Sequence, residues 1–189
     1  MTKARLEAFS DGVIAILITI MVLELKVPHG TGWEALQPVL PVLGTYLMSF
    51  VFLGIYWANH HHLLHTLERV NGAILWANLH LLFWLSLIPF VMSWMSENHF
   101  AAVPTSAYGI VQLLSAIAYT ILERVIIAHQ GAQSKLAAAI GKEVKGYVSI
   151  GLYVAGTLIA FVQPWIAFLF YATVSLIWLV PDRRIERRL

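Results

Sequence analysis

A cluster of polar and charged side chains stands just ahead of an apolar stretch near the start of this 189-residue chain. Arg5, Glu7, Ser10 and Asp11 fall within seven residues, and the eleven residues from Val13 to Leu23 that follow carry no charge. An uncharged run of this length is too short to cross a membrane alone, so a crossing helix must include the polar cluster. Such groups need protein or water around them. The segment is therefore expected to lie in the protein interior and to be its functional element.

A run of histidines forms the second candidate site, at His60, His61, His62 and His65. His61 and His65 are four residues apart and would share a helix face, a spacing that can bind a transition metal. The chain has no cysteine and no H-E-x-x-H motif to support such a site. We therefore favour a histidine run at the membrane interface, and we expect no metal site and no resident cofactor. A pH response of these imidazoles is the other alternative.

Most other chemistry lacks its residues. The sequence contains no phosphate-binding loop, no catalytic triad and no usefully spaced carboxylate pair, so we expect no enzyme activity. The net charge is +2, and four of the 12 Lys and Arg residues lie in the last seven positions. This tail predicts an anchor that touches anionic lipid, and no nucleic-acid partner is expected.

The composition predicts an all-α, polytopic membrane protein. Hydrophobic residues make up 59% of the chain, charged residues 12%, and the mean hydropathy is +0.75. Each apolar run must satisfy its backbone hydrogen bonds internally, as an α-helix does. Residues 1–189 are expected to form a single transmembrane domain. Its six predicted helices cover residues 5–27, 36–58, 71–95, 104–128, 146–163 and 165–181.

The distribution of basic residues predicts the topology. If six helices alternate across the membrane, Lys3, Arg5, Arg69, the lysines after the fourth helix and the C-terminal arginines share one side. Lys26 falls on the other side. Positively charged loops resist translocation, so both termini are predicted to be cytoplasmic in a multi-pass protein of the inner (plasma) membrane. No small-residue cleavage site follows the first apolar stretch, so it is not a signal peptide.

Three stretches of the sequence carry a resemblance to a known family. The first is R-x-x-x-F-S-D, from Arg5 to Asp11, followed by an apolar helix with a threonine. The second is W-x-x-H, from Trp57 to His60, and the third is Asn78 with Pro89 eleven residues later. Together these stretches resemble the bacterial and archaeal relatives of transmembrane protein 175, the endolysosomal potassium channel. The resemblance spans the first three predicted helices.

The resemblance implies an assembly and a permeant ion. Bacterial members of that family assemble as homotetramers of one six-helix unit around a central pore lined by the first helix. This chain contains one such unit and no internal repeat, so a homotetramer in membrane lipid is implied. The T-V-G-Y-G carbonyl filter of ordinary potassium channels is absent from the sequence. Selectivity for monovalent cations would then come from side chains or from a constriction.

Helical spacing indicates which side chains could form that constriction. Ile16, Thr19, Ile20 and Leu23 share one face of a helix, which gives an apolar stripe with one hydroxyl. The resemblance places an isoleucine constriction at Ile16, a hydroxyl layer with a nearby K⁺ at Thr19, and a further apolar ring at Leu23. Two alternatives stay open: the stripe is an ordinary packing face, or the Thr19 hydroxyl bonds a carbonyl one turn back.

The polar cluster is expected to hold the first helix in place. A buried Asp11 carboxylate would seek a donor, for which His60 and Asn78 are candidates. The resemblance implies a clamp against the second and third helices with Trp57 packed beside it. As an alternative, a ring of Asp11 side chains attracts cations at the cytoplasmic mouth. The clamp candidates are Arg5, Phe9, Ser10, Asp11, Trp57, His60 and Asn78.

These patterns together favour a potassium-selective or potassium-permeable cation channel with a hydrophobic constriction and no carbonyl filter. The alternative is a secondary transporter of a small cation or proton. Transporters tend to have inverted repeats and a midplane site, whereas the polar residues here gather at one membrane face. That placement favours the channel.

Overall fold

The chain is an all-α protein. The computed structural model describes residues 2–131, 133–134, 136–137 and 144–179, and within these ranges the regular structure is helical, with no strand. The elements are α1 (Lys3–Ile20), the 3₁₀ helices η1 (Met21–Glu24) and η2 (Trp33–Val39), α2 (Leu40–His65), α3 (Gly72–Ser86), α4 (Ile88–Glu97), α5 (Ala102–Gln130), α7 (Val144–Ile159) and α8 (Pro164–Leu179). The basic C-terminal tail of the sequence prediction lies outside the described residues.

Four helical segments are long and apolar enough to cross a membrane. These are Lys3–Glu24, Trp33–His65, Gly72–Glu97 and Ala102–Gln130. The helices α7 and α8 are also apolar but shorter, with 16 described residues each, or about 24 Å of helix. With α3 and α4 taken as one interrupted span, the arrangement is the predicted six-helix multi-pass membrane protein.

Two predicted helix boundaries are wrong. The second helix continues to His65 rather than ending at residue 58, so the histidine run is helical. The third predicted helix, 71–95, is divided at Leu87 into α3 and α4. Pro89 has no backbone N–H to donate to the preceding turn, which accounts for the break. At the break itself, the Leu87 N–H donates to the carbonyl three residues back, that of Trp84, at 3.2 Å.

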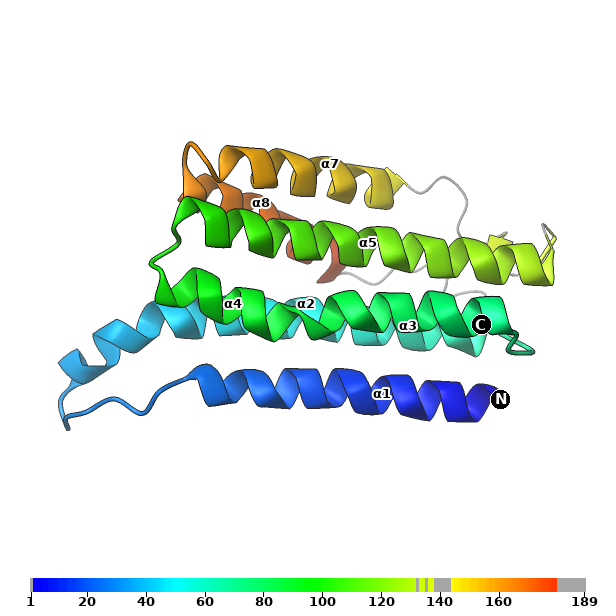
Figure 1. The fold of residues 1–189 in the computed structure, drawn as a ribbon, viewed down its shortest axis with the longest axis horizontal. Coiled ribbons are helices and arrows are strands. Elements are labelled where there is room, and N and C mark those ends of the chain that lie inside the picture. The colour runs from blue at the N-terminus through cyan, green and yellow to red at the C-terminus, as the bar shows by residue number, and fades with distance from the viewer. Residues whose placement is uncertain (1, 132, 135, 138–143, 180–189) are drawn as a thin grey trace.

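The helices lie roughly side by side in a layered bundle (Figure 1). α1 packs against α2, α3 and α4, while α5 packs against α3, α4, α7 and α8. The sequence predicts an interior first helix, but within this single chain α1 lies at one edge of the bundle (Figure 1). One face of α1 is therefore not covered by the other described helices of this chain.

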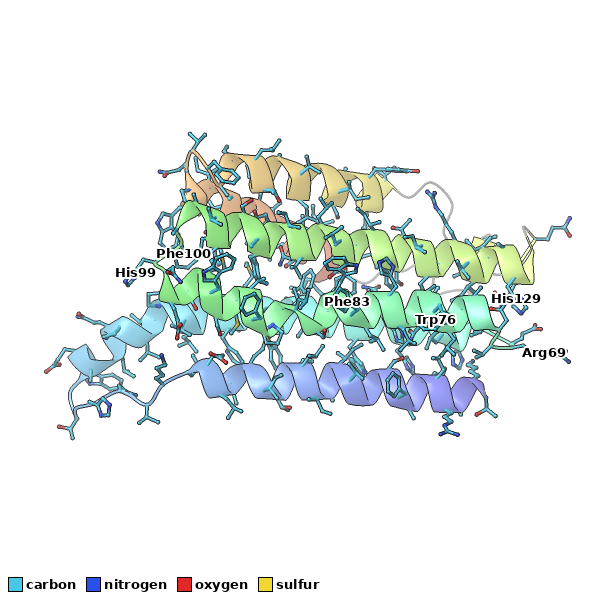
Figure 2. The ribbon with its side chains drawn as sticks, viewed as in Figure 1. Arg69, Trp76, Phe83, His99, Phe100 and His129 are labelled. Carbon is cyan, nitrogen blue, oxygen red and sulfur yellow. The ribbon has the colours of Figure 1, made fainter. Side chains whose placement is uncertain are left out.

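Charged and polar side chains gather at the two ends of the bundle. Figure 2 shows Arg69 and His129 at one end and His99 at the other. The Lys3 ammonium donates to the His65 carbonyl at 2.7 Å, so the start of α1 lies at the Arg69 end, where α2 finishes. Lys3 and Arg69 of the topology prediction thus lie at the same end, and Lys26, paired with Glu97 at the end of α4, lies at the other. Which end faces the cytoplasm stays a prediction.

A close approach of three helices centres on Tyr171 of α8. A Cβ atom at Gly109 of α5 would overlap the Tyr171 hydroxyl, and one at Gly156 of α7 would lie 2.6 Å from its ring. The hydroxyl donates to the Thr105 carbonyl at 3.3 Å. Only glycine leaves room for this packing, which joins the second half of the chain into one unit.

Candidate functional site

The α1 helix has a buried face and an exposed face. Leu6, Ser10, Ile14, Leu17 and Met21 are buried against the neighbouring helices. Their spacing of three or four residues places them along one side of the helix. This side fixes the orientation of α1 relative to α2, α3 and α4.

The other face of α1, continued by Leu23 in the 3₁₀ helix η1, carries the four side chains predicted to line a pore. Ile16 is 59% exposed and Leu23 is 77% exposed, and Thr19 and Ile20 are exposed between them. Leu17, next to Ile16 along the chain, is only 6% exposed. The exposed surface is an apolar stripe with one hydroxyl, in a segment otherwise suited to a membrane interior.

The Thr19 hydroxyl is bonded to its own helix. Its Oγ1 lies 3.0 Å from the Ala15 carbonyl oxygen and 2.9 Å from the Ile16 carbonyl oxygen. The bond one turn back, which the sequence left open, is therefore present. The hydroxyl oxygen is nevertheless on the exposed face, so the two descriptions of Thr19 are compatible.

A chain of buried hydrogen bonds holds α1 to two other helices. The His60 Nε2–H of α2 donates to Asn78 Oδ1 of α3 at 2.6 Å, and Asn78 Nδ2 donates to Ser10 Oγ of α1 at 3.0 Å. Ser10 Oγ donates in turn to the Leu6 carbonyl at 2.9 Å. All four residues are buried. We name this chain of bonds, from His60 to Leu6, the relay.

Asp11 has a different donor from the two that the sequence suggested. Asn78 donates to Ser10 and accepts from His60, so neither side chain bonds Asp11. The Asp11 Oδ1 instead accepts from the indole Nε1–H of Trp57 at 3.1 Å. Trp57 is 48% exposed, so this bond lies at the open side of the bundle. Sequence reasoning gave Trp57 a packing role only, and no spacing in the sequence indicates the indole as the donor.

Two residues of the predicted clamp do not join it. Arg5 is exposed, and among the described residues its side chain makes no hydrogen bond or ion pair. Phe9 is half exposed on the same side of α1 as Ile16. Lys3, which the sequence assigned to the topology and not to the clamp, lies 3.8 Å from Glu7 and donates to the His65 carbonyl of α2. Within one chain, Arg5 and Phe9 therefore belong with the exposed face.

His61 and His65 of the histidine run stack with Trp57 along the exposed side of α2, whereas His60 is buried. The rings of Trp57 and His61 are 6.4 Å apart, and those of His61 and His65 are 6.2 Å apart. In the described part of the chain, no three His, Cys, Asp or Glu side chains are grouped to hold a metal ion. The site formed by α1 and α2 consists of a helix held by hydrogen bonds to its neighbours and an exposed apolar face on that helix.

The far end of α1 is tied down by an exposed ion pair. The Lys26 ammonium lies 2.9 Å from the Glu97 carboxylate at the end of α4. The hydrogen bond that the Lys26 ammonium donates to Glu97, and then the negative charge of Glu97, raise the pKa of Lys26 above its ordinary value of 10.5. This contact connects the segment after η1 to the end of the third span.

Comparison with known proteins agrees with these features. A family model described as "Endosomal/lysosomal potassium channel TMEM175" matches residues 5–89, which contain most of α1, the relay and the α3–α4 break. A potassium channel from Chryseobacterium sp. (strain P1-3) is 60% identical over 189 residues, covering 100% of this chain and 98% of the relative. A potassium channel from Streptomyces collinus is 35% identical over 128 residues, covering 64% of this chain and 62% of the relative.

A solved structure has the same fold. It is the crystal structure of a lysosomal potassium-selective channel TMEM175 homolog from Chamaesiphon minutus. The TM-score is 0.78 at 27% sequence identity, and the match covers 95% of this chain and 97% of that chain. With the full-length similarity at 60% identity, this match shows that the chain belongs to the TMEM175 family.

Proposed function

We propose that this protein is a potassium-permeable cation channel of the plasma membrane. Residues 1–189 form one channel domain, four copies surround a central pore, and the exposed face of α1 lines it. Both termini lie in the cytoplasm. The observation that carries the proposal is the exposed stripe of α1, because a helix held by buried polar bonds presents Ile16, Thr19 and Leu23 to open surroundings.

The stripe would form two apolar necks with a hydroxyl layer between them. Ile16 and Leu23 are seven residues apart, which is roughly 10 Å along the helix. A narrow ring of aliphatic side chains closes a pore by dewetting, since it offers an ion no replacement for its hydration shell. Conduction then requires the necks to widen. Ile20 lies on the same stripe and contributes to its apolar surface.

The relay would keep this stripe turned toward the pore. Ser10 lies on the face of α1 opposite Ile16, and its bond to Asn78 fixes the rotation of the helix. The Asp11–Trp57 bond supports a holding role for Asp11 as well. In this account the permeant K⁺ needs no cofactor and no resident metal, and the protein is not an enzyme.

The break between α3 and α4 is the feature that favours the alternative, a secondary transporter. Transporters often bind substrate at a broken helix near the bilayer midplane. Beside the break, Leu85, Ile88 and Val91 are apolar and buried, and the Ser86 hydroxyl donates to the Phe83 carbonyl of its own helix. The residues from Leu85 to Val91 carry no charge, which favours the channel.

The permeant ion is tested in planar bilayers with the purified protein. Under asymmetric potassium and sodium, the current should reverse near the potassium equilibrium potential if the pore prefers potassium. The same recording under a proton gradient measures proton permeation. Currents that saturate at transporter rates and show no single-channel steps would contradict the proposal.

The pore-lining face is tested with three asparagine substitutions on one helix. Ile16→Asn and Leu23→Asn should wet the necks, because an amide hydrogen-bonds water where a methyl group does not. Both variants should raise the cation leak. Leu17→Asn is the matched control, since that side chain is buried and an amide there should lower stability without raising current. Loss of protein in all three variants, with no leak in any, would refute the pore assignment.

A further inference from the structure

One side of α5 is polar over much of the membrane thickness. It carries Thr105, Tyr108, Gln112, Ser115 and Tyr119, whose spacing of three or four residues places them along one line of the helix. The first and the last are 14 residues apart, about 21 Å of helix in a hydrocarbon core of about 30 Å. We name this side the polar face of α5. Polar side chains at such depth are costly unless they have polar partners.

Three side chains of the polar face have partners within the protein. The Tyr108 hydroxyl lies 2.8 Å from the Ser49 Oγ of α2. The Ser115 hydroxyl donates to a carbonyl one turn back at 2.8 Å. The Tyr119 hydroxyl donates to the Asn59 carbonyl of α2 at 3.2 Å. These bonds connect the polar face to α2 at two levels.

The amide of Gln112, in the middle of the polar face, has no hydrogen-bond partner among the described residues. Gln112 is 0% exposed, and neither its Oε1 nor its Nε2 forms a hydrogen bond. An amide has two donor hydrogens and an accepting oxygen, and burying them unpaired is unfavourable. The Tyr108 hydroxyl, one turn back, lies near enough to interact with the amide without bonding it. A water molecule between two such groups bonds both.

The other unpartnered hydroxyls gather beside the same face. In the described part of the chain, five buried side-chain polar atoms lack a partner, and four of them belong to Thr105, Gln112 and Thr157. A Cβ atom at Gly109, which lies between Thr105 and Gln112 on α5, would be 2.7 Å from the Thr157 Oγ1 of α7. Hydroxyls and amides both donate and accept. The groups that need a partner therefore lie in one region of the core.

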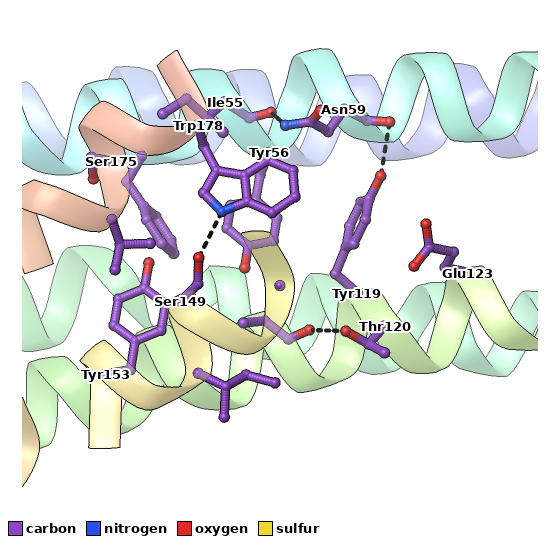
Figure 3. Close-up of a pocket in the computed structure, with 15 residues that line it drawn as sticks. Ile55, Tyr56, Asn59, Tyr119, Thr120, Glu123, Ser149, Tyr153, Ser175 and Trp178 are labelled. Carbon is purple, nitrogen blue, oxygen red and sulfur yellow. Dashed lines mark hydrogen bonds between the residues drawn. The ribbon is translucent and has the colours of Figure 1, made fainter. Parts of the chain in front are cut away.

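A cavity of about 100 Å³ lies next along α5 (Figure 3). Its wall includes Ala116, one turn after Gln112, together with Tyr119 and side chains of α2, α7 and α8. The Thr120 and Ser175 hydroxyls in this wall donate to carbonyls of their own helices at 3.0 and 3.4 Å, so their lone pairs remain for a donor. Water takes about 30 Å³ per molecule in the liquid, and cavities with polar groups in their walls hold it.

We propose that each copy of this protein binds a row of water molecules in its core, along the polar face of α5. The first molecule bonds the Gln112 amide and the Tyr108 hydroxyl, and the others fill the cavity beyond Ala116. Water is the ligand because it donates and accepts, as an amide with both kinds of group requires. The row is separate from the proposed pore, since the helices around it are α2, α5, α7 and α8. Each copy then has a hydrated core of its own.

The bound water is detected by X-ray hydroxyl-radical footprinting of the purified protein, read by mass spectrometry. Irradiation splits bound water in place, so a buried side chain beside it is oxidised without access to bulk solvent. Tyr108 and Tyr153, which are 0% and 2% exposed, should be oxidised faster than Met21, which is 0% exposed on η1. A methionine thioether is readily oxidised, so Met21 gives the rate of a dry buried site. A rate at either tyrosine no greater than that of Met21 would overturn the proposal.

Two variants connect the oxidation to the two parts of the row. Gln112→Met removes the amide and nearly keeps the length of the side chain, so the oxidation of Tyr108 should fall to the rate of Met21. Ala116→Leu fills part of the cavity and should do the same for Tyr153, which lines it. Unchanged oxidation of Tyr108 in Gln112→Met, or of Tyr153 in Ala116→Leu, would also overturn the proposal. The rates in the unchanged protein decide the question even if a variant fails to fold. Because no current is measured, the result stands apart from the test of the channel.

Discussion

Removing the amide of Asn78 should destabilise the protein more than its size suggests. Asn78→Leu keeps the number of side-chain heavy atoms and the branching, so the packing between α1, α2 and α3 is largely preserved. What is lost is the centre of the relay. The substitution removes the bond from His60 at 2.6 Å and the bond to Ser10 at 3.0 Å.

The expected loss follows from the two bonds and the group left behind. Side-chain hydrogen bonds between membrane helices contribute about 1 kcal/mol each. Ser10 keeps its bond to the Leu6 carbonyl, but the His60 Nε2–H, which is buried, is left without an acceptor. An unpaired buried donor costs about 1 to 3 kcal/mol, so the free energy of unfolding should fall by about 3 to 5 kcal/mol in total.

The assay is reversible unfolding in mixed micelles, with Asn98→Leu as the matched control. Asn98 is exposed and donates only to the Trp94 carbonyl of its own helix, so its replacement should cost less than about 0.5 kcal/mol. Ser10→Ala should cost about 1 kcal/mol, and the double variant should cost less than the sum of the two. A loss in Asn78→Leu no greater than in Asn98→Leu, or strict additivity with Ser10→Ala, would refute the relay as the support of α1.

Three smaller predictions concern the ends and the packing of the bundle. Asp11→Ala removes the acceptor of the half-exposed Trp57 indole, so the free energy of unfolding should fall by about 1 kcal/mol and the tetramer yield on size exclusion should be lower. Normal yield with reduced conductance would instead place Asp11 at the pore mouth. Gly109→Ala should destabilise the protein by about 1 to 3 kcal/mol in thermal unfolding, because the new Cβ would overlap the Tyr171 hydroxyl. Gly44→Ala is the control, since a Cβ at Gly44 meets no other atom, and it should be neutral or slightly stabilising. The raised pKa of Lys26 means that its ammonium is charged at neutral pH and is lost only as the pH rises above its ordinary pKa of 10.5. Because the Lys26–Glu97 ion pair is exposed to solvent, Lys26→Ala should nevertheless leave the unfolding midpoint unchanged at neutral pH.

The helical period predicted which side chains of α1 share a face, but not which face is buried. Both stripes are apolar, since Ile14, Leu17 and Met21 alternate with Ile16, Ile20 and Leu23 around the helix. Hydrophobicity therefore could not distinguish them. The distinction comes from Ser10, whose partner Asn78 lies 68 positions away in the chain and is brought near only by the packing of α3.

Five of the seven predicted clamp residues make the contacts that hold α1, whereas Arg5 and Phe9 do not, and the pairing of the five was not predictable. Ser10 and Asp11 are adjacent in sequence, but successive residues of a helix point about 100° apart, so they meet different neighbours. Ser10 faces α3 and Asp11 faces the Trp57 indole of α2. The end of α2 was also missed, because a run of Asn and His is typical of a loop. In the structure these side chains continue the helix to His65.

The hydrogen bonds of the Thr19 hydroxyl determine whether it can interact with a cation or with an anion. The single hydroxyl proton of Thr19 is directed at backbone carbonyls of the same helix. Only the lone pairs of the oxygen can therefore interact with an ion at the exposed face. In a fourfold pore these lone pairs would form a ring of acceptors with no donor beside them. A chloride ion would find nothing there to replace its water, while a cation would. Discrimination against anions would thus arise from the direction of one proton, without any charged residue at the neck.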